Sequence, residues 1–191
     1  MLPPPPLPAP CAPDLIAARV AELEPTLNGG AWLLDARRSA PMAAFAQLMG
    51  APLAVVQLIR LAGCESRAER TLALSGEGLA DELVVAGGLL APQRSERTQW
   101  QWRAFERPSL VGPMPAVLSF DALGNLQLVA QNAARGLLVT TTLLPVAPDP
   151  LAPARQDLLA QEVAVTDAAG AVRATLRRYF TRARAGEASA Q

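Results

Sequence analysis

Histidine and lysine are both absent from this chain of 191 residues, so all 17 of its positively charged side chains are arginine. A catalytic serine or cysteine activated by histidine needs an imidazole whose pKa lies near neutrality, and none exists within the chain. Schiff-base chemistry and the phosphate-binding P-loop need a lysine, and histidine-based zinc motifs need an imidazole. The sequence therefore excludes many enzyme classes. Its wealth of arginine, alanine and proline is typical of a bacterial genome of high GC content.

Cysteine is scarce as well: the two that occur, Cys11 and Cys64, are far apart and form no paired motif. Four cysteine ligands for a structural zinc ion cannot be assembled from one chain. We therefore expect no metal ion and no cofactor. The N-terminus lacks the basic start and apolar core of a signal peptide, which predicts a cytoplasmic protein. The most apolar segment, 41–63, contains Pro52 and Arg60, so we expect no membrane span.

The charges balance, because the 17 arginines face 17 acidic side chains, and 51% of the residues are apolar. Such a composition predicts a folded domain rather than a disordered chain. We expect a Pro-rich flexible tail over 1–13 and a single domain over 14–183. Within it, 14–63 reads as a helical layer and 66–183 as mainly β, followed by a frayed tail over 184–191.

Two turn sequences, Asp121–Asn125 and Asp167–Gly170, each lie between alternating apolar stretches and predict β-hairpins. Consecutive hairpins favour a meander. The predicted fold class is α+β, with the N-terminal helices packed on an antiparallel, mostly meander β-sheet of about five to seven strands.

Aromatic residues make up only 4% of the chain, yet Trp100 and Trp102 are two positions apart. On a strand both indoles project from one face, where they can stack a ligand or fill the core. We predict ligand binding at Trp100, Trp102 and Arg103, with Arg178 from the final strand. Core packing of the two indoles is the alternative.

The C-terminal strand is rich in arginine. Arg173, Arg177 and Tyr179 fall on one face and Arg178 on the other. Because guanidinium groups pair with carboxylates and phosphates, we predict that the first three contact a protein partner. The alternative is a solvated outer face whose arginines pair with acids of the chain itself.

The segment 42–62 has the spacing of a helix-turn-helix, with a bend at Gly50. Its second helix offers only Gln57 and Arg60 to base edges or phosphates. A buried helical hairpin is the prediction, and nucleic acid is not expected as a partner. DNA binding through 42–62 is the third functional hypothesis.

Acid–base chemistry in this chain has carboxylates as its main candidates. Glu162, Glu106, Asp81 and Glu82 are possible only by elimination. An enzyme of the lyase or isomerase type, using arginine and carboxylate groups on a small anionic metabolite, is therefore the second hypothesis. The leading hypothesis is a non-catalytic cytoplasmic accessory protein that binds a protein partner or a small, partly apolar ligand on its β-sheet. The sequence does not predict an oligomeric state.

Overall fold

The computed structural model describes residues 5–61, 68–85, 94–109, 112–146 and 158–183. Cys64 and the tail predicted over 184–191 lie outside these ranges. The helices are α1 (Pro13–Leu27), α2 (Met42–Leu48) and α3 (Leu53–Leu61), with one turn of 3-10 helix at Ala133–Arg135. The strands are β1 (Ala31–Leu34), β2 (Ala68–Ser75), β3 (Gly78–Val85), β4 (Arg94–Gln101), β5 (Phe105–Arg107), β6 (Met114–Phe120), β7 (Leu126–Asn132), β8 (Leu137–Val146), β9 (Leu158–Asp167) and β10 (Val172–Arg182).

All of these strands belong to one antiparallel sheet in the order β4-β3-β2-β1-β10-β9-β8-β7-β6-β5. Two meanders, β1–β4 and β5–β10, are joined where β1 pairs with β10. Antiparallel pairing and the α+β class are confirmed, but the expected five to seven strands were too few, since the sheet has 10. Strands β1 and β5 have only 4 and 3 residues, too short for alternation to identify them firmly.

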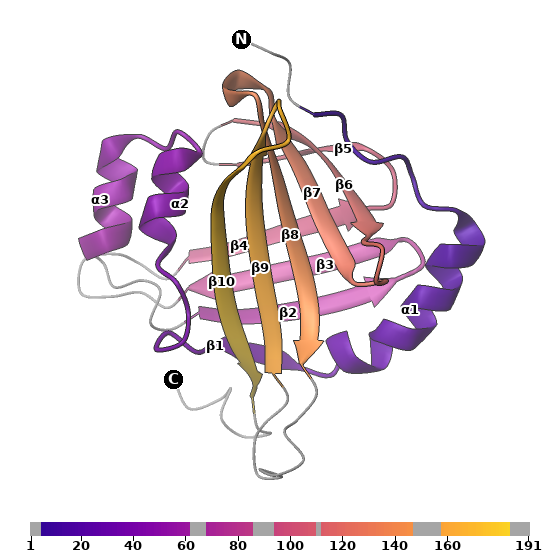
Figure 1. Ribbon diagram of the computed structural model, residues 1–191. Helices are drawn as coiled ribbons and strands as arrows, with labels where there is room; N and C mark the ends of the chain where they lie inside the picture. Colours follow the sequence, from indigo (N-terminus) through magenta and orange to yellow (C-terminus); the bar gives the residue numbers. More distant parts are fainter. Residues whose placement is uncertain (1–4, 62–67, 86–93, 110–111, 147–157, 184–191) are drawn as a thin grey trace.

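The sheet curls into a barrel-like form, with β1–β4 crossing behind β6–β10 (Figure 1). Its two edge strands, β4 and β5, meet through side chains and not through backbone pairing. The rings of Trp100 and Phe105 pack edge to face with centroids 5.8 Å apart. Sheet-on-sheet packing therefore buries the inner face, and the helices lie on two sides of the barrel instead of forming the expected covering layer (Figure 1).

Helix α1 is held to the barrel by the residues that follow it. The Asn28 side chain both donates to the Leu74 carbonyl, at 2.9 Å, and accepts from the Leu74 amide, at 2.6 Å. The Trp32 indole donates to the carbonyl of Leu27, the last residue of α1. Before α1, the carbonyl of Pro5 accepts a hydrogen bond from the Gln131 side chain, so the proline-rich segment reaches β7.

The α2–α3 hairpin bends at Gly50, which has a φ of 86° that favours glycine. The buried Asn132 side chain donates to the Met49 carbonyl and fixes the hairpin to the end of β7. One side of α3 packs on α2, whereas Leu53 and Leu58 are 72% and 58% exposed. The burial expected of this hairpin thus holds for one side of α3 only. No helix in the described ranges is long and apolar enough to cross a membrane.

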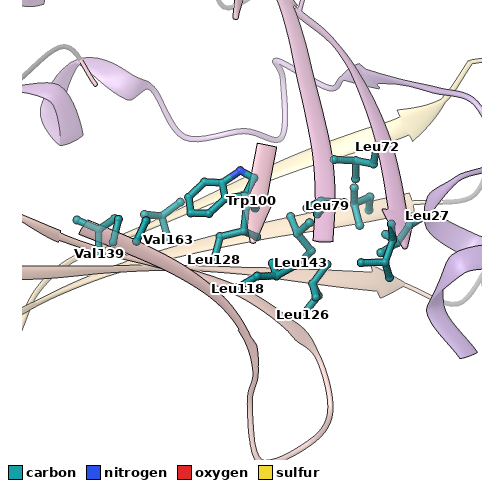
Figure 2. Packing of buried hydrophobic residues seen from close by; sticks show 14 of the residues in the cluster. Leu27, Leu72, Leu79, Trp100, Leu118, Leu126, Leu128, Val139, Leu143 and Val163 are labelled. Carbon is teal, nitrogen blue, oxygen red and sulfur yellow. The ribbon is translucent and has the colours of Figure 1, made fainter. Parts of the chain in front are cut away.

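Inside the barrel, one contiguous cluster of apolar side chains forms the core (Figure 2). The two predicted hairpins both contribute to it: β6 pairs with β7, and β9 pairs with β10. Several leucines are at most 1% exposed: Leu72, Leu74, Leu79, Leu118, Leu126, Leu128 and Leu143. These side chains fill one part of the interior, and a polar cluster occupies another.

Candidate functional site

The interior contains a cavity of about 170 Å³ with an unusual concentration of charge. Its walls come from α2 and from strands on both sides of the barrel. The lining side chains are Met42, Arg70, Asp81, Leu83, Glu96, Thr98, Arg107, Gln161, Arg178 and Phe180.

Two arginines enter this cavity because they occupy inward positions on otherwise apolar strand faces. Arg70 alternates with buried residues on β2, which has the burial pattern of a strand with one face in the core. Arg178 lies between the buried Leu176 and Phe180 on β10. Gln161 is directly opposite Arg178 in the β9–β10 pair. The curvature of the ten-stranded sheet therefore directs both guanidinium groups into the same space.

Arg70 forms a two-pronged ion pair with Asp81 on β3. Its Nε donates to Oδ1 at 2.8 Å and its Nη2 to Oδ2 at 2.7 Å. The two side chains are only 5% and 14% exposed, so water screens the pair weakly. The guanidinium groups of Arg70 and Arg178 each lie 5.7 Å from the centroid of the Phe180 ring.

Arg107, on the edge strand β5, reaches across to β4. Its guanidinium carbon lies 4.8 Å from the centroid of Trp100, and its Nη2 lies 3.6 Å from a carboxylate oxygen of Glu96. Burial lowers the pKa of Arg107 below its usual value, as does the nearby charge of Arg70, whereas Glu96 and Asp81 oppose the shift. An arginine remains charged after such a shift, so the cavity keeps a cation that is partly removed from water.

Two donors in the cavity find no acceptor among the described residues: Nη1 of Arg70 and Nε of Arg107. Buried N–H groups are nearly always hydrogen-bonded, so this pair of donors can receive an anionic oxygen. In the described part of the chain, no group of three or more carboxylate or thiol side chains is placed to hold a metal ion.

The two predicted tryptophans lie on the inner face of the barrel. Trp100 is 4% exposed and Trp102 is 7% exposed. Trp102 packs on Phe120 with centroids 5.0 Å apart and donates to the Ser75 carbonyl. Trp100 contacts Arg107, and Arg107 in turn lines the cavity. The alternative of core packing describes Trp102 well, whereas Trp100 combines a core position with contact to the site.

Arg103 and Arg178 are not brought together. Arg103 is exposed, and its Nε donates to the Gln101 side chain. It lines an open outer groove of about 860 Å³ between the start of α1, the β2–β3 turn and β4. Trp102 and Cys11 also line that groove.

The three residues predicted to contact a partner lie on the outer face of β10. Arg173 pairs with Asp167 at 2.5 Å, and Arg177 pairs with Glu162 at 2.9 Å. The Tyr179 ring lies below the guanidinium groups of Arg177 and Arg38, at 5.5 and 4.7 Å. The alternative stated for this face, arginines paired with acids of the same chain, describes these contacts. A protein partner here stays a prediction.

Of the four candidate carboxylates, only Asp81 lines the cavity. Glu162 pairs with Arg177 on the outer face, and Glu82 pairs with Arg97. Glu106 is exposed on β5.

The sequence reasoning missed Arg70 and Arg107 as members of the site. A pattern was available for Arg70, because it is the one charged position in the alternating series Ala68, Arg70, Leu72 and Leu74. A charge at an inward position is costly, so it points to a buried partner or a ligand. No local pattern marks Arg107, whose strand has only 3 residues.

No protein-family model matches this chain, and no curated protein does. Solved structures do share its fold. The Schistosoma mansoni fatty acid binding protein, in complex with arachidonic acid, is 14% identical, with a TM-score of 0.52 over 84% of this chain and 99% of that one. The Caenorhabditis elegans lipid binding protein 8 is 12% identical, with a TM-score of 0.55 over 81% and 94% of the two chains. A secretary abundant heat soluble protein from Ramazzottius varieornatus is 15% identical, with a TM-score of 0.53 over 81% and 93%. At such identities the likeness establishes the barrel-like fold.

Proposed function

We propose that this chain is a non-catalytic binding protein that holds a small, partly apolar acid inside its barrel. One observation carries the proposal: Arg70, Arg107 and Arg178 converge on a single interior cavity. Burying charged groups is expensive, so guanidinium groups gathered at one place in a barrel interior point to a ligand as well as to partners within the chain. A bound carboxylate can accept hydrogen bonds from the cavity's donors that have no acceptor among the described residues.

The donors of the cavity fit a carboxylate. Arg70, which lines the cavity, already uses Nε and Nη2 on Asp81, and its buried Nη1 has no acceptor among the described residues. Nε of Arg107 is likewise without one. Charge-assisted hydrogen bonds to carboxylates are about twice as strong as neutral ones, so two donors suffice to orient the head of a ligand. Leu83, Met42 and Phe180 offer apolar contact to its body.

The fold neighbours support this use of the interior. One is described as a fatty acid transporter and another as a fatty acid binding protein solved with arachidonic acid. In this proposal Arg178 keeps its predicted role as a ligand-binding residue, and Trp100 serves as the apolar support of Arg107. The protein partner at Arg173, Arg177 and Tyr179 and the cytoplasmic setting stay predictions.

The test compares two neighbouring substitutions on opposite faces of β10, Arg178→Gln and Arg177→Gln. Purified protein is titrated in a calorimeter with hexanoate, benzoate and palmitate. We expect at least one acid to bind, with a loss of about tenfold or more in affinity for Arg178→Gln and little change for Arg177→Gln. If none of the three acids binds, or if the two variants weaken binding equally, the proposal is wrong.

The enzyme hypothesis keeps one observation in its favour, since Asp81 and Glu96 share the cavity with the arginines. This hypothesis predicts a closed pocket lined by Arg103 or Arg178 together with a carboxylate, and Arg178 lines the cavity whereas Arg103 does not. Turnover of a bound acid, detected as a change in its mass and abolished by Asp81→Asn, would support an enzyme. Recovery of the acid unchanged supports a binding protein.

A further inference from the structure

The ten-stranded sheet is interrupted where its two edges meet. The strands pair in one series that ends with β4 on one side and β5 on the other. Among the described residues, the contacts between these edges come from side chains: the Trp100 ring packs on Phe105, and Arg107 lies over Trp100. Arg107 also faces Glu96 at 3.6 Å. A seam without backbone hydrogen bonds separates more readily than a paired ladder, so this β4–β5 seam is the weakest line in the described wall of the barrel.

The arginine-lined cavity reaches solvent at the β4–β5 seam. Glu96 on β4 and Arg107 on β5 both line it, and their side chains are 44% and 27% exposed. Farther inside, the side chains of Arg70 and Asp81 are only 5% and 14% exposed. Exposure therefore rises from the buried ion pair towards the seam. A ligand that approaches Arg70 from this side passes between the two edge strands.

Residues 5–12, which we call the strap, run along the outside of the barrel and begin in the row of β5. The Pro5 carbonyl accepts a hydrogen bond of 2.8 Å from the Gln131 side chain on β7. The β6–β7 register, continued by one position, places Gln131 opposite Pro115. Pro115 in turn pairs with Glu106 of β5. The first described residue of the strap is therefore anchored to a row of residues that ends at the seam.

The other end of the strap lies near β4. Pro10 and Cys11 line the outer groove together with Gln99 and Gln101 of β4. Figure 1 shows the strap descending along the side of the barrel that carries β5 and β6 before the chain enters α1. The strap thus spans the seam from outside, because it is anchored on the side of β5–β7 and continues to the side of β4.

The length of the strap fits this span. Its prolines favour polyproline II, which advances about 3.1 Å per residue, so the chain from Pro5 to Pro10 covers about 16 Å. Neighbouring strands are about 4.8 Å apart, which puts β5 about 10 Å from β7 and leaves about 6 Å for the seam. Proline has no amide N–H, so the strap is poorly suited to join the sheet as a strand and close the seam by backbone pairing. It restrains the two edges without making them continuous.

We infer that the β4–β5 seam is the entrance to the cavity and that the strap restrains its opening. This inference rests on the proposed function for the ligand and adds the route that the ligand takes. No residue of the strap is among the described residues that line the cavity. The strap therefore acts on the rate at which the barrel opens, and the affinity of the closed site stays the same.

Releasing the strap at its anchor tests the restraint without any ligand. Gln131→Glu replaces the amide that donates to Pro5 by a carboxylate that repels the carbonyl. Gln127→Glu is the matched control, because Gln127 lies on the same face of β7 and its amide donates to Thr142 on β8. Hydrogen exchange of the full chain, followed by mass spectrometry, reports local opening in each variant.

We expect the peptides that contain β4 and β5 to exchange about fivefold faster in Gln131→Glu, which is the factor that one net hydrogen bond contributes, and to be unchanged in Gln127→Glu. Equal exchange of β4 and β5 in the two variants overturns the restraint. Acceleration of β9 by the same factor as β4 also overturns it, because the whole barrel is then destabilised.

The rates of binding test the entrance. Hexanoate, benzoate and palmitate are mixed with each variant in a stopped-flow instrument, and tryptophan fluorescence reports binding because Trp100 contacts Arg107 of the cavity. For each acid that binds, we expect association and dissociation to be about fivefold faster in Gln131→Glu than in Gln127→Glu, with equal affinities. Unchanged rates, or a changed affinity with an unchanged association rate, overturn the entrance. If none of these acids binds, the proposed function fails and the entrance with it, whereas hydrogen exchange still decides the restraint.

Discussion

Replacing Asp81 by asparagine removes the partner of a buried arginine while it keeps the shape of the side chain. Arg70 is 5% exposed and donates two hydrogen bonds of 2.7 and 2.8 Å to the Asp81 carboxylate. Breaking a buried pair by removing one partner costs about 3–5 kcal/mol, because the remaining charge stays buried. Asparagine can still accept one hydrogen bond, so we expect a loss near the lower end, about 3 kcal/mol.

Glu82→Gln is the control. Glu82 is the next residue along β3 and pairs with Arg97 on the outer face, where the two side chains are 34% and 74% exposed. Such exposed pairs contribute roughly 0–1 kcal/mol. The double variant Arg70→Met, Asp81→Leu removes both charges, and we expect it to recover most of the stability lost by Asp81→Asn.

Urea unfolding followed by tryptophan fluorescence gives the free energy of unfolding for each variant. Stability and ligand binding should also be linked in this variant. Asp81→Asn leaves more positive charge around the cavity, so a saturating carboxylate should stabilise this variant more than the unsubstituted protein. If Asp81→Asn destabilises the protein no more than Glu82→Gln does, the Arg70–Asp81 pair does not stabilise the barrel as stated.

Three other predictions concern the turns and the N-terminal segment. Gly78 has a φ of 151°, and a Cβ there would collide with the Trp100 carbonyl, so Gly78→Ala should lower the free energy of unfolding by more than about 1 kcal/mol; a neutral result would contradict this geometry. Burial raises the pKa of Asp121, but hydrogen bonds from the Asn125 side chain and from backbone amides outweigh it and lower the pKa below 3.8. The stabilisation that the Asp121 carboxylate provides is present above pH 3.8 and is lost as the pH falls through the lowered pKa. Urea unfolding should therefore show Asp121→Asn to be less stable than the unsubstituted chain at about pH 7, with a smaller difference in the free energy of unfolding at about pH 3. An equal difference at the two pH values would argue against this role of Asp121. Deleting residues 1–12 removes the hydrogen bond between Gln131 and Pro5, next to Val117 and Val129, which are buried on the outer face of β6 and β7. We therefore expect a lower midpoint of thermal unfolding. An unchanged midpoint would mean that this segment contributes nothing to stability.

The sequence alone excluded the enzyme classes that depend on histidine or lysine, since a chain without these residues cannot build such sites, whatever its fold. Alternation along each long strand also lies in the sequence. It correctly put Arg178 on the face of β10 opposite to Arg177. The hairpin turns at Asp121–Asn125 and Asp167–Gly170 were predictable because short polar turns with glycine act locally.

The association of strands distant in the chain was decided only in three dimensions. The short strands β1 and β5 have little preference of their own and exist because longer neighbours pair with them. Closure of the sheet brings Arg107 over Trp100, and strand pairing places the guanidinium groups of Arg70 and Arg178 near the ring of Phe180. Periodicity tells which face a residue occupies, but curvature decides which faces meet. Arg70, Arg107 and Arg178 are far apart in sequence, and only the closed sheet makes them one site.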